Sequence, residues 1–265
     1  MMNRKKTNLK TVPLMVVLLF TFLSLTSQVF ADGDWNIITV DVGPFQVGRN
    51  SSIALDADGY AHISYTDSTF PELRYAAFDG SSWHIENVDV TGQIGVYTSI
   101  ALDSSGNPHI SYYDATTLRH AGFSSTWFIE TVDTGGVGQY PSIAMDSSDN
   151  PHISYYDATL DDLKYAAFDG SSWHIETVDS TGDVGQSSSI ALDADDYTHI
   201  SYFWKTASNN GILKYAYMKY AYCGYELIGD VNDDCKVDLR DLAAMVMNWL
   251  IDCDQTPQDP ACVPK

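Results

Sequence analysis

Short apolar runs separated by polar turns fill the middle of the chain, and four such runs recur in a fixed order. The first run reads W-x-I-x-x-V-D and begins at Trp35, Trp83, Trp127 and Trp173. The second reads S-I-A-[LM]-D and ends at Asp56, Asp103, Asp146 and Asp193. The third reads H-I-S-Y and begins at His62, His109, His152 and His199. The fourth reads L-[RK]-[YH]-A and begins at Leu73, Leu118, Leu163 and Leu213.

The segments between these runs have the composition of tight turns. Asp-Gly, Asn-Pro and FDGSS stand between runs that are rich in β-branched and aromatic residues, which indicates hairpins. The region has no helical period. Four antiparallel strands in each repeat of about 46 residues are typical of β-propeller blades. The sequence therefore predicts an all-β fold, a four-bladed β-propeller with four strands per blade.

The phase of the repeat predicts how the ring closes. The chain enters the repeats at a Trp run and leaves after the fourth L-K-Y-A run, near Ala216. The last blade therefore lacks an outer strand, while the first Trp run lacks a blade before it. We expect Trp35–Asp41 to supply the missing strand by pairing near Leu213–Met218, which also removes an exposed sheet edge.

Composition excludes several classes of partner. The chain has 14 basic and 35 acidic residues, a formal net charge of -21, so neither nucleic acid nor an anionic membrane surface is an expected partner. Hydrophobic residues make up 45% and charged residues 18%, which is a globular composition. Most of the acid is Asp, a turn residue and an oxygen ligand for hard cations.

The two ends of the chain predict secretion and a separate C-terminal module. A basic segment, an apolar run from Val12 to Leu25 and a small-residue site at Ala31 have the order of a signal peptide, residues 1–31. An uncleaved membrane anchor is the alternative, although the run is shorter than a membrane span prefers. We expect a secreted protein, extracellular or attached to the cell surface, with no stable membrane insertion after cleavage. The propeller then covers residues 32–222 and the module covers 223–265.

The repeats resemble the secreted β-propellers of the sialidase-like repeat superfamily. The likeness rests on the phrases S-I-A-L-D-x-x-G-N-P-H-I-S-Y-Y-D and L-K-Y-A, and it covers residues 35–222. It implies the architecture and leaves the function open. The Asp-box S-x-D-x-G-x-T-W that many of these relatives carry is absent as such.

Candidate binding residues lie where the copies differ, because residues repeated in every blade are expected to have the same packing role in each. Loops before the second run and loops between the third and fourth runs should share one face of the molecule. Aromatic rings there would stack on a sugar, while amides and carboxylates would bind its hydroxyls. The candidates are Arg49 with its neighbour Asn50, Tyr97, Gln139, Tyr140, Asp114, Asp157 and Trp204.

Catalysis is the less favoured reading of the same face. The sequence has no Ser-His-Asp signature, phosphate loop, zinc motif or dinucleotide fingerprint. The resemblance implies an arginine cluster for sialoside cleavage, but the propeller has only Arg49, Arg74 and Arg119. A two-carboxylate mechanism built from Asp114 and Asp157 stays open. We expect a non-catalytic protein of carbohydrate binding or polysaccharide utilisation; the alternatives are a glycoside hydrolase or lyase, and a structural cell-surface protein.

The C-terminal module has the spacing of a calcium loop. Side-chain oxygens fall at loop positions 1, 3, 5, 9 and 12, and the backbone carbonyl of Lys236 falls at position 7. The expected side-chain ligands of Ca²⁺ are Asp230, Asn232, Asp234, Asp238 and Asp241. A short α-helix is expected from Arg240 to Leu250. The four cysteines are even in number and clustered in this module, which predicts two disulfides whose pairing stays open: Cys223, Cys235, Cys253 and Cys262.

Residues 229–251 resemble one calcium-binding half of a type I dockerin. The likeness rests on D-x-N-x-D at Asp230–Asp234 and on the D-L-A that follows the loop. It implies docking onto a cohesin-like scaffold protein. Cys235 stands where that family has glycine, and Asp252-Cys253-Asp254 begins a second repeat that does not continue.

Overall fold

The structure is a computed structural model that describes residues 35–43, 46–67, 72–91, 97–206 and 210–218. The chain divides into two units, residues 1–38 and 39–265, and the fold described here is that of the second unit. The predicted signal peptide and the predicted calcium module, with its helix, its ligands and its cysteines, lie outside the described residues.

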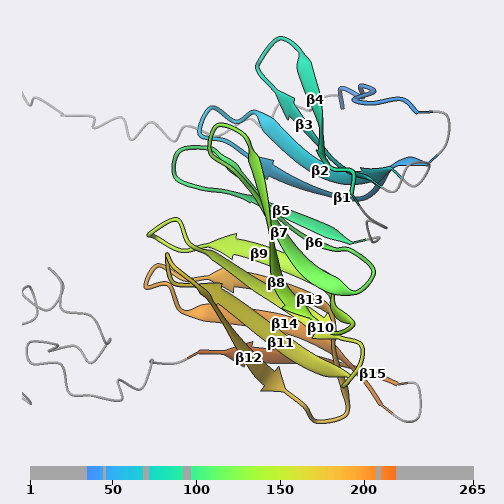
Figure 1. Cartoon of the computed structure of the whole chain (residues 1–265), viewed down its shortest axis with the longest axis vertical. Coiled ribbons are helices and arrows are strands. Elements are labelled where there is room, and N and C mark those ends of the chain that lie inside the picture. The colour runs from blue at the N-terminus through green and yellow to red at the C-terminus, as the bar shows by residue number, and fades with distance from the viewer. Residues whose placement is uncertain (1–34, 44–45, 68–71, 92–96, 207–209, 219–265) are drawn as a thin grey trace, which may run out of the picture. The chain divides into compact units, whose positions relative to one another are not determined.

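In these residues, fifteen antiparallel strands form four sheets that follow one another along the chain (Figure 1). Blade 1 contains β1 (Val47–Leu55), β2 (Ala61–Asp67), β3 (Glu72–Phe78) and β4 (Trp83–Asp89). Blade 2 contains β5 (Thr98–Leu102), β6 (Pro108–Tyr113), β7 (Thr117–Phe123) and β8 (Trp127–Thr134). Blade 3 contains β9 (Val137–Met145), β10 (Pro151–Asp157), β11 (Asp162–Phe168) and β12 (Trp173–Asp179). Blade 4 contains β13 (Asp183–Leu192), β14 (Thr198–Lys205) and β15 (Gly211–Tyr217).

Aspartate side chains shape the hairpins between these strands. Between β1 and β2, the Asp56 carboxylate accepts hydrogen bonds from the backbone N–H groups of Asp58 (3.0 Å) and Tyr60 (2.8 Å). Asp103, Asp146 and Asp193 repeat this contact in the next three blades. Such Asx-type turns explain the abundance of Asp in the sequence.

The core lies between consecutive blades rather than within one sheet. Leu73 and Tyr75 of blade 1 pack with Ile100 and Tyr112 of blade 2. Equivalent clusters join blade 2 to blade 3 and blade 3 to blade 4. Each sheet therefore buries both faces only when it has a neighbour on each side, which is the general physics of stacked repeats. Within the residues that the structure describes, the prediction of an all-β fold with propeller-type blades is confirmed.

The fourth blade differs from the prediction in its outer edge. In the described part of the chain it has three strands, in the order β13-β14-β15, and residues 35–43 are not in a strand. The closing strand expected from Trp35–Asp41 is thus not formed in the structure. Within this stretch, the Asp41 carboxylate accepts hydrogen bonds from Tyr65 (2.7 Å) and Arg74 (3.1 Å) of blade 1.

Candidate functional site

Two sets of loops meet on one face, as the repeat predicts. The backbone N–H of Gly136, before β9, donates to the carbonyl of Thr116, between β6 and β7, at 2.8 Å. Val184 donates in the same way to Asp161 at 2.9 Å. Loops that enter the inner strands therefore lie beside loops that join the second and third strands.

In blades 1, 3 and 4, a β-bulge in the inner strand takes one residue out of the regular pairing with the second strand. Asn50, Tyr140 and Ser187 each stand three residues before the inner-strand isoleucine, and their φ angles are 51°, 51° and 52°. The left-handed conformation is costly for residues with a side chain, by about 1 kcal/mol or more. Register shifts in β1, β9 and β13 near these positions mark the bulges, a device that re-aims side chains beside functional sites. Tyr97 holds the equivalent position in blade 2.

These four positions line one open pocket of about 330 Å³. The Tyr97 and Tyr140 rings face each other with their centroids 4.3 Å apart, tilted by 42°. Tyr156 contacts Tyr140, with 6.3 Å between the ring centroids. The complete lining is Asn50, Ser51, Tyr97, Thr98, Tyr140, Pro141, Ser187 and Ser188.

The chemistry of the pocket is aromatic and neutral. Burial, followed by hydrogen bonding to Tyr140, raises the pKa of Tyr97 to about 12, so its hydroxyl stays protonated at neutral pH. The lining adds an amide at Asn50 and hydroxyls at Ser51, Thr98, Ser187 and Ser188, and none of its described residues carries a carboxylate. This set can stack on an apolar surface and exchange hydrogen bonds, but it offers no acid–base pair.

The structure places only part of the predicted site in this pocket. Tyr97 and Tyr140 come together there. Arg49 adjoins Asn50 but donates its guanidinium hydrogen bond to Gln46 (2.9 Å). Gln139 pairs with Tyr156 in the β9–β10 ladder and does not line the pocket.

The two predicted carboxylates are held by their own turns. Asp114 accepts a hydrogen bond from the backbone of Thr117 (2.9 Å) and forms an ion pair with Arg119. Asp157 is buried and accepts hydrogen bonds from the backbone N–H groups of Thr159 (2.9 Å) and Leu160 (3.1 Å). Each carboxylate therefore has a structural role in the hairpin that contains it.

Trp204 belongs to the packing between blades 3 and 4. Its ring packs against the third core cluster, and the Lys214 ammonium lies 5.0 Å from its centroid in a cation–π contact. The side chain is outside the Tyr97–Tyr140 pocket.

The recurring histidines have a common structural role, as expected for repeated residues. His62, His152 and His199 each hydrogen-bond a tyrosine hydroxyl on the neighbouring strand. In blade 2 the partner of His109 is instead His120, at 3.0 Å.

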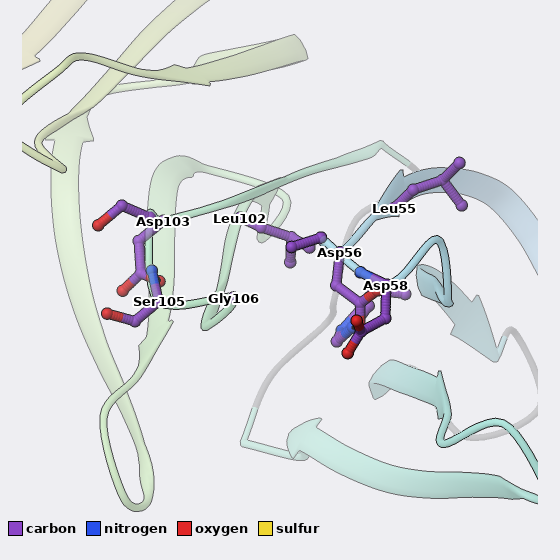
Figure 2. Close-up of a pocket in the computed structure, with 10 residues that line it drawn as sticks. Leu55, Asp56, Asp58, Leu102, Asp103, Ser105 and Gly106 are labelled. Carbon is purple, nitrogen blue, oxygen red and sulfur yellow. Dashed lines mark hydrogen bonds and ion pairs between the residues drawn. The ribbon is translucent and has the colours of Figure 1, made fainter.

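A second cavity, of about 370 Å³, lies between the first hairpins of blades 1 and 2. Figure 2 shows Asp56 and Asp58 on one side of it and Asp103 and Ser105 on the other. At the next two junctions the corresponding hairpins are joined by a serine and an aspartate. Ser104 of blade 2 donates hydrogen bonds from its backbone N–H and its hydroxyl to the carboxylate of Asp149, and Ser147 of blade 3 does the same to Asp196. The equivalent residues at the first junction are Ala57 and Gly106, which cannot form that pair.

Sequence reasoning missed five pocket residues: Ser51, Thr98, Pro141, Ser187 and Ser188. The signal that finds them is positional: they precede the inner-strand isoleucine by two or three residues. In the part of the chain that the structure describes, no group of three or more His, Cys, Asp or Glu residues is arranged to hold a metal ion. The same part contains no helix long and apolar enough to cross a membrane.

Comparisons with known proteins show similarity of fold alone. No protein-family model matches the chain, and no curated protein sequence matches it. A crystal structure of a protein of unknown function from Dyadobacter fermentans superposes with a TM-score of 0.52 and 12% identity, covering 64% of this chain and 53% of that one. This chain thus spans about half the length of that structure.

Two sugar-related structures are also similar, at lower scores. The Aleuria aurantia lectin, solved with Fucα1-6GlcNAc, has a TM-score of 0.44 and 13% identity over 65% of this chain and 62% of its own. The GH43 endo-arabinanase of Bacillus licheniformis has a TM-score of 0.43 and 13% identity over 65% of this chain and 72% of its own.

Proposed function

We propose that this protein is a secreted, non-catalytic β-propeller protein that binds carbohydrate through the Tyr97–Tyr140 pocket. The observation that carries the proposal is the pair of facing tyrosine rings, 4.3 Å apart, beside Asn50 and a set of hydroxyls. Sugars present apolar C–H faces that stack on aromatic rings, and hydroxyls that amides and alcohols recognise.

The local strain of the pocket supports a functional role. Tyr140 and Ser187 adopt left-handed backbone angles that these residue types rarely occupy. A fold retains such angles only where the surrounding structure determines them, and such residues cluster at ligand sites. A shallow neutral pocket of this kind is expected to bind weakly, with a Kd from micromolar to millimolar, or roughly 4–8 kcal/mol.

A glycoside hydrolase or lyase on the same propeller is supported less well. Asp114 and Asp157 were the candidate acid and base, and both are committed to their own turns. An acid–base pair needs two carboxylates in different environments that face one substrate. A purely structural cell-surface role remains the third candidate, and it leaves the strained tyrosine pocket without a purpose.

A glycan array followed by titration of the best ligand tests the binding proposal. Tyr97→Ala and Tyr140→Ala should each weaken binding about tenfold or more, because stacking is lost. Tyr97→Phe should retain most of the affinity, since it keeps the ring and loses only the hydroxyl. Phe128→Ala, an exposed aromatic on β8 outside the pocket, is the matched control and should bind like wild type.

Two outcomes would contradict the proposal. One is an array with no ligand, or a ligand whose affinity is the same in all four variants. The other is release of reducing sugar from a polysaccharide panel that Asp114→Asn or Asp157→Asn abolishes, which would favour the hydrolase.

The tail completes the proposal as a calcium-dependent attachment module. The spacing of the oxygen ligands over Asp230–Asp241 supports this proposal. In the proposal, the four cysteines of the module form disulfides, and residues 229–251 bind a cohesin-like scaffold protein. Titrating Ca²⁺ into the purified protein should give a saturable heat that Asp230→Ala removes. Asp252→Ala, in the incomplete second repeat, is the matched control and should keep the heat. If both variants behave like wild type, the loop binds no calcium.

Secretion follows from residues 1–31 in this proposal. The N-terminal sequence of the protein recovered from the culture medium should begin at Asp32. Retention of the whole chain in the membrane fraction would instead favour the uncleaved anchor.

A further inference from the structure

The three junctions between blades bury the same repeat positions. The residues at these positions in the first and last blades are exposed. Leu73, Leu118 and Leu163 are fully buried against the next blade, whereas Leu213 of the last blade is 82% exposed. The inner-strand isoleucines Ile100, Ile143 and Ile190 are buried against the preceding blade, whereas Ile53 of the first blade is 61% exposed.

Cross-blade hydrogen bonds show the same pattern. At each junction the hydroxyl of an inner-strand serine accepts a hydrogen bond from the backbone N–H of the next isoleucine at 3.2 Å: Ser52 with Ile100, Ser99 with Ile143, Ser142 with Ile190. The fourth serine of this series, Ser189, is exposed. By the same pattern, its hydroxyl would accept a hydrogen bond from the backbone N–H of an Ile53 at the other end of an array. A second series of hydrogen bonds joins the H-I-S-Y serine of one blade to the inner strand of the next: Ser64 with Thr98, and Ser154 with Ser188 at 3.0 Å. The corresponding residues at the two ends of the array are Ser201 and Ser51, and both are exposed.

Blade 4 has a cavity at the position that a tryptophan of the outer strand occupies in blades 2 and 3. Trp127 packs on Tyr75 of the preceding blade (5.2 Å between centroids), and Trp173 packs on His120 (5.5 Å). The equivalent partner for blade 4 is Tyr165, which lines a cavity of about 270 Å³ together with Val178, Thr198, Ala216, Tyr217 and Met218. Trp35, the first residue of the remaining Trp run, is 94% exposed.

Asp41 makes the same contact with blade 1 that an aspartate at or near the end of each outer strand makes with the following blade. Asp89 and Asp179 end β4 and β12, and Asp133 is the next-to-last residue of β8. Each of the three accepts a hydrogen bond from the H-I-S-Y tyrosine of the following blade. Asp41 makes this bond to Tyr65 of blade 1. Asp41 therefore makes, with blade 1, the contact that the outer strand of a preceding blade makes at the other three positions.

We infer that two copies of this chain join end to end, so that blade 4 of one copy packs on blade 1 of the other and residues Trp35–Asp41 supply its fourth strand. A second copy is the occupant because Ile53 and Leu213 stay exposed in the single chain, and each end is a repeat of the surface that covers the other. Two such contacts make a closed ring of eight blades, within the four to eight that propellers contain.

The pairing register follows from blade 3. There Leu163 pairs with Asp179, Tyr165 with Glu176 and Ala166 with Ile175. The equivalent pairs are Leu213 with Asp41, Tyr215 with Ile38, and Ala216 with Ile37, each across two copies. Trp35 then enters the cavity beside Tyr165. This inference does not depend on carbohydrate binding.

The mass in solution tests the assembly. Light scattering on the purified protein at tens of micromolar should give twice the mass of one chain. Leu213→Asp and Trp35→Ala should reduce the mass to that of one chain without loss of the β-sheet circular dichroism signal, because both side chains are exposed in the single chain. Leu160→Asp is the matched control: Leu160 is 67% exposed in a loop away from both ends, and this variant should stay dimeric. A monomeric wild type, or variants that all stay dimeric, would overturn the inference.

Disulfide trapping identifies which copies meet. One preparation carries Ile38→Cys and another carries Tyr215→Cys; mixed and oxidised, they should form a crosslink between positions 38 and 215 that peptide mass mapping identifies. Replacing the second variant with Leu160→Cys should abolish the crosslink. A double variant, Ile38→Cys with Tyr215→Cys, that crosslinks only within a monomer would show closure by a single chain and would overturn the two-copy assembly.

Discussion

At the scale of residues, one substitution between copies changes the chemistry of a buried pair. Three of the repeated histidines face a tyrosine hydroxyl, but His109 in blade 2 faces the imidazole of His120. Burial, together with the neighbouring His120, lowers the pKa of His109 to about 4. The neutral form is favoured in the folded state, because burial penalises the imidazolium and a second imidazole adds to the repulsion.

This pair predicts a loss of stability in mild acid. The pKa of His109 is about 4 in the folded protein and about 6.5 in the unfolded chain, so the unfolded chain binds more protons between these values. Stability that is present above pH 6.5 should therefore decrease as the pH falls toward 4. His120→Tyr restores the partner found in the other blades, and it should reduce that decrease by about 1 kcal/mol.

Urea unfolding of wild type and His120→Tyr at pH 7.0, 5.5 and 4.5 measures the effect. Equal losses of unfolding free energy in the two proteins would mean that His109 is not the group responsible.

At the scale of elements, the inner strands approach the preceding blade so closely that a side chain cannot fit. Gly138 begins the bulged part of β9 with a φ of 105°, and a Cβ there would lie 2.7 Å from the Cα of Leu118. Gly185 in β13 has the same relation to Leu163, also at 2.7 Å. The obstacle is backbone, which cannot rotate away, so these glycines set the distance between blades.

Gly138→Ala should therefore destabilise the fold by about 3 kcal/mol, from the steric overlap and the positive φ together. Gly135 separates the two causes. Its φ is 109°, and a Cβ there would meet nothing within 4 Å, so Gly135→Ala should cost only about 1 kcal/mol. Chemical denaturation of the two variants gives the comparison, and equal effects would exclude the close approach of the blades as the cause.

At the scale of the whole molecule, the blades are similar units whose junctions differ in their hairpin contacts. The Ser–Asp contact joins blades 2 and 3 and blades 3 and 4. Ala57 and Gly106 replace it between blades 1 and 2, where a cavity opens instead (Figure 2). Because neighbouring repeats stabilise one another through such interfaces, the first junction is expected to be the weakest of the three.

Restoring the contact should strengthen that junction. Gly106 has a φ of 81°, and Asp149 and Asp196 tolerate 63° at the same position, so an aspartate fits the backbone there. The double variant Ala57→Ser with Gly106→Asp should raise the unfolding free energy by about 1 kcal/mol relative to the sum of the single variants. A double-mutant cycle by urea denaturation measures this coupling, and a coupling of zero would show that the hairpins do not meet as they do at the later junctions.

The sequence by itself determined the strands, their turns and their order. Local chemistry sets these features: β-branched runs prefer the extended backbone, and each Asp turn is stabilised by its own side chain, so a repeat of about 46 residues is sufficient to recognise a blade. The loop face and two of its residues, Tyr97 and Tyr140, were also predictable, because they are the aromatic positions at which the copies differ.

The tertiary structure alone decided which polar residues are structural and which line the pocket. Asp114, Asp157 and Trp204 have the composition of a binding site in the sequence, but contacts with their own hairpins or with the neighbouring blade engage them. The bulges at Asn50, Tyr140 and Ser187 depend on how each inner strand meets the next blade, which no local pattern reports. The same holds for the ends of the array: Ile53 and Leu213 have the sequence of core residues, and only the packing of whole blades reveals that they are exposed.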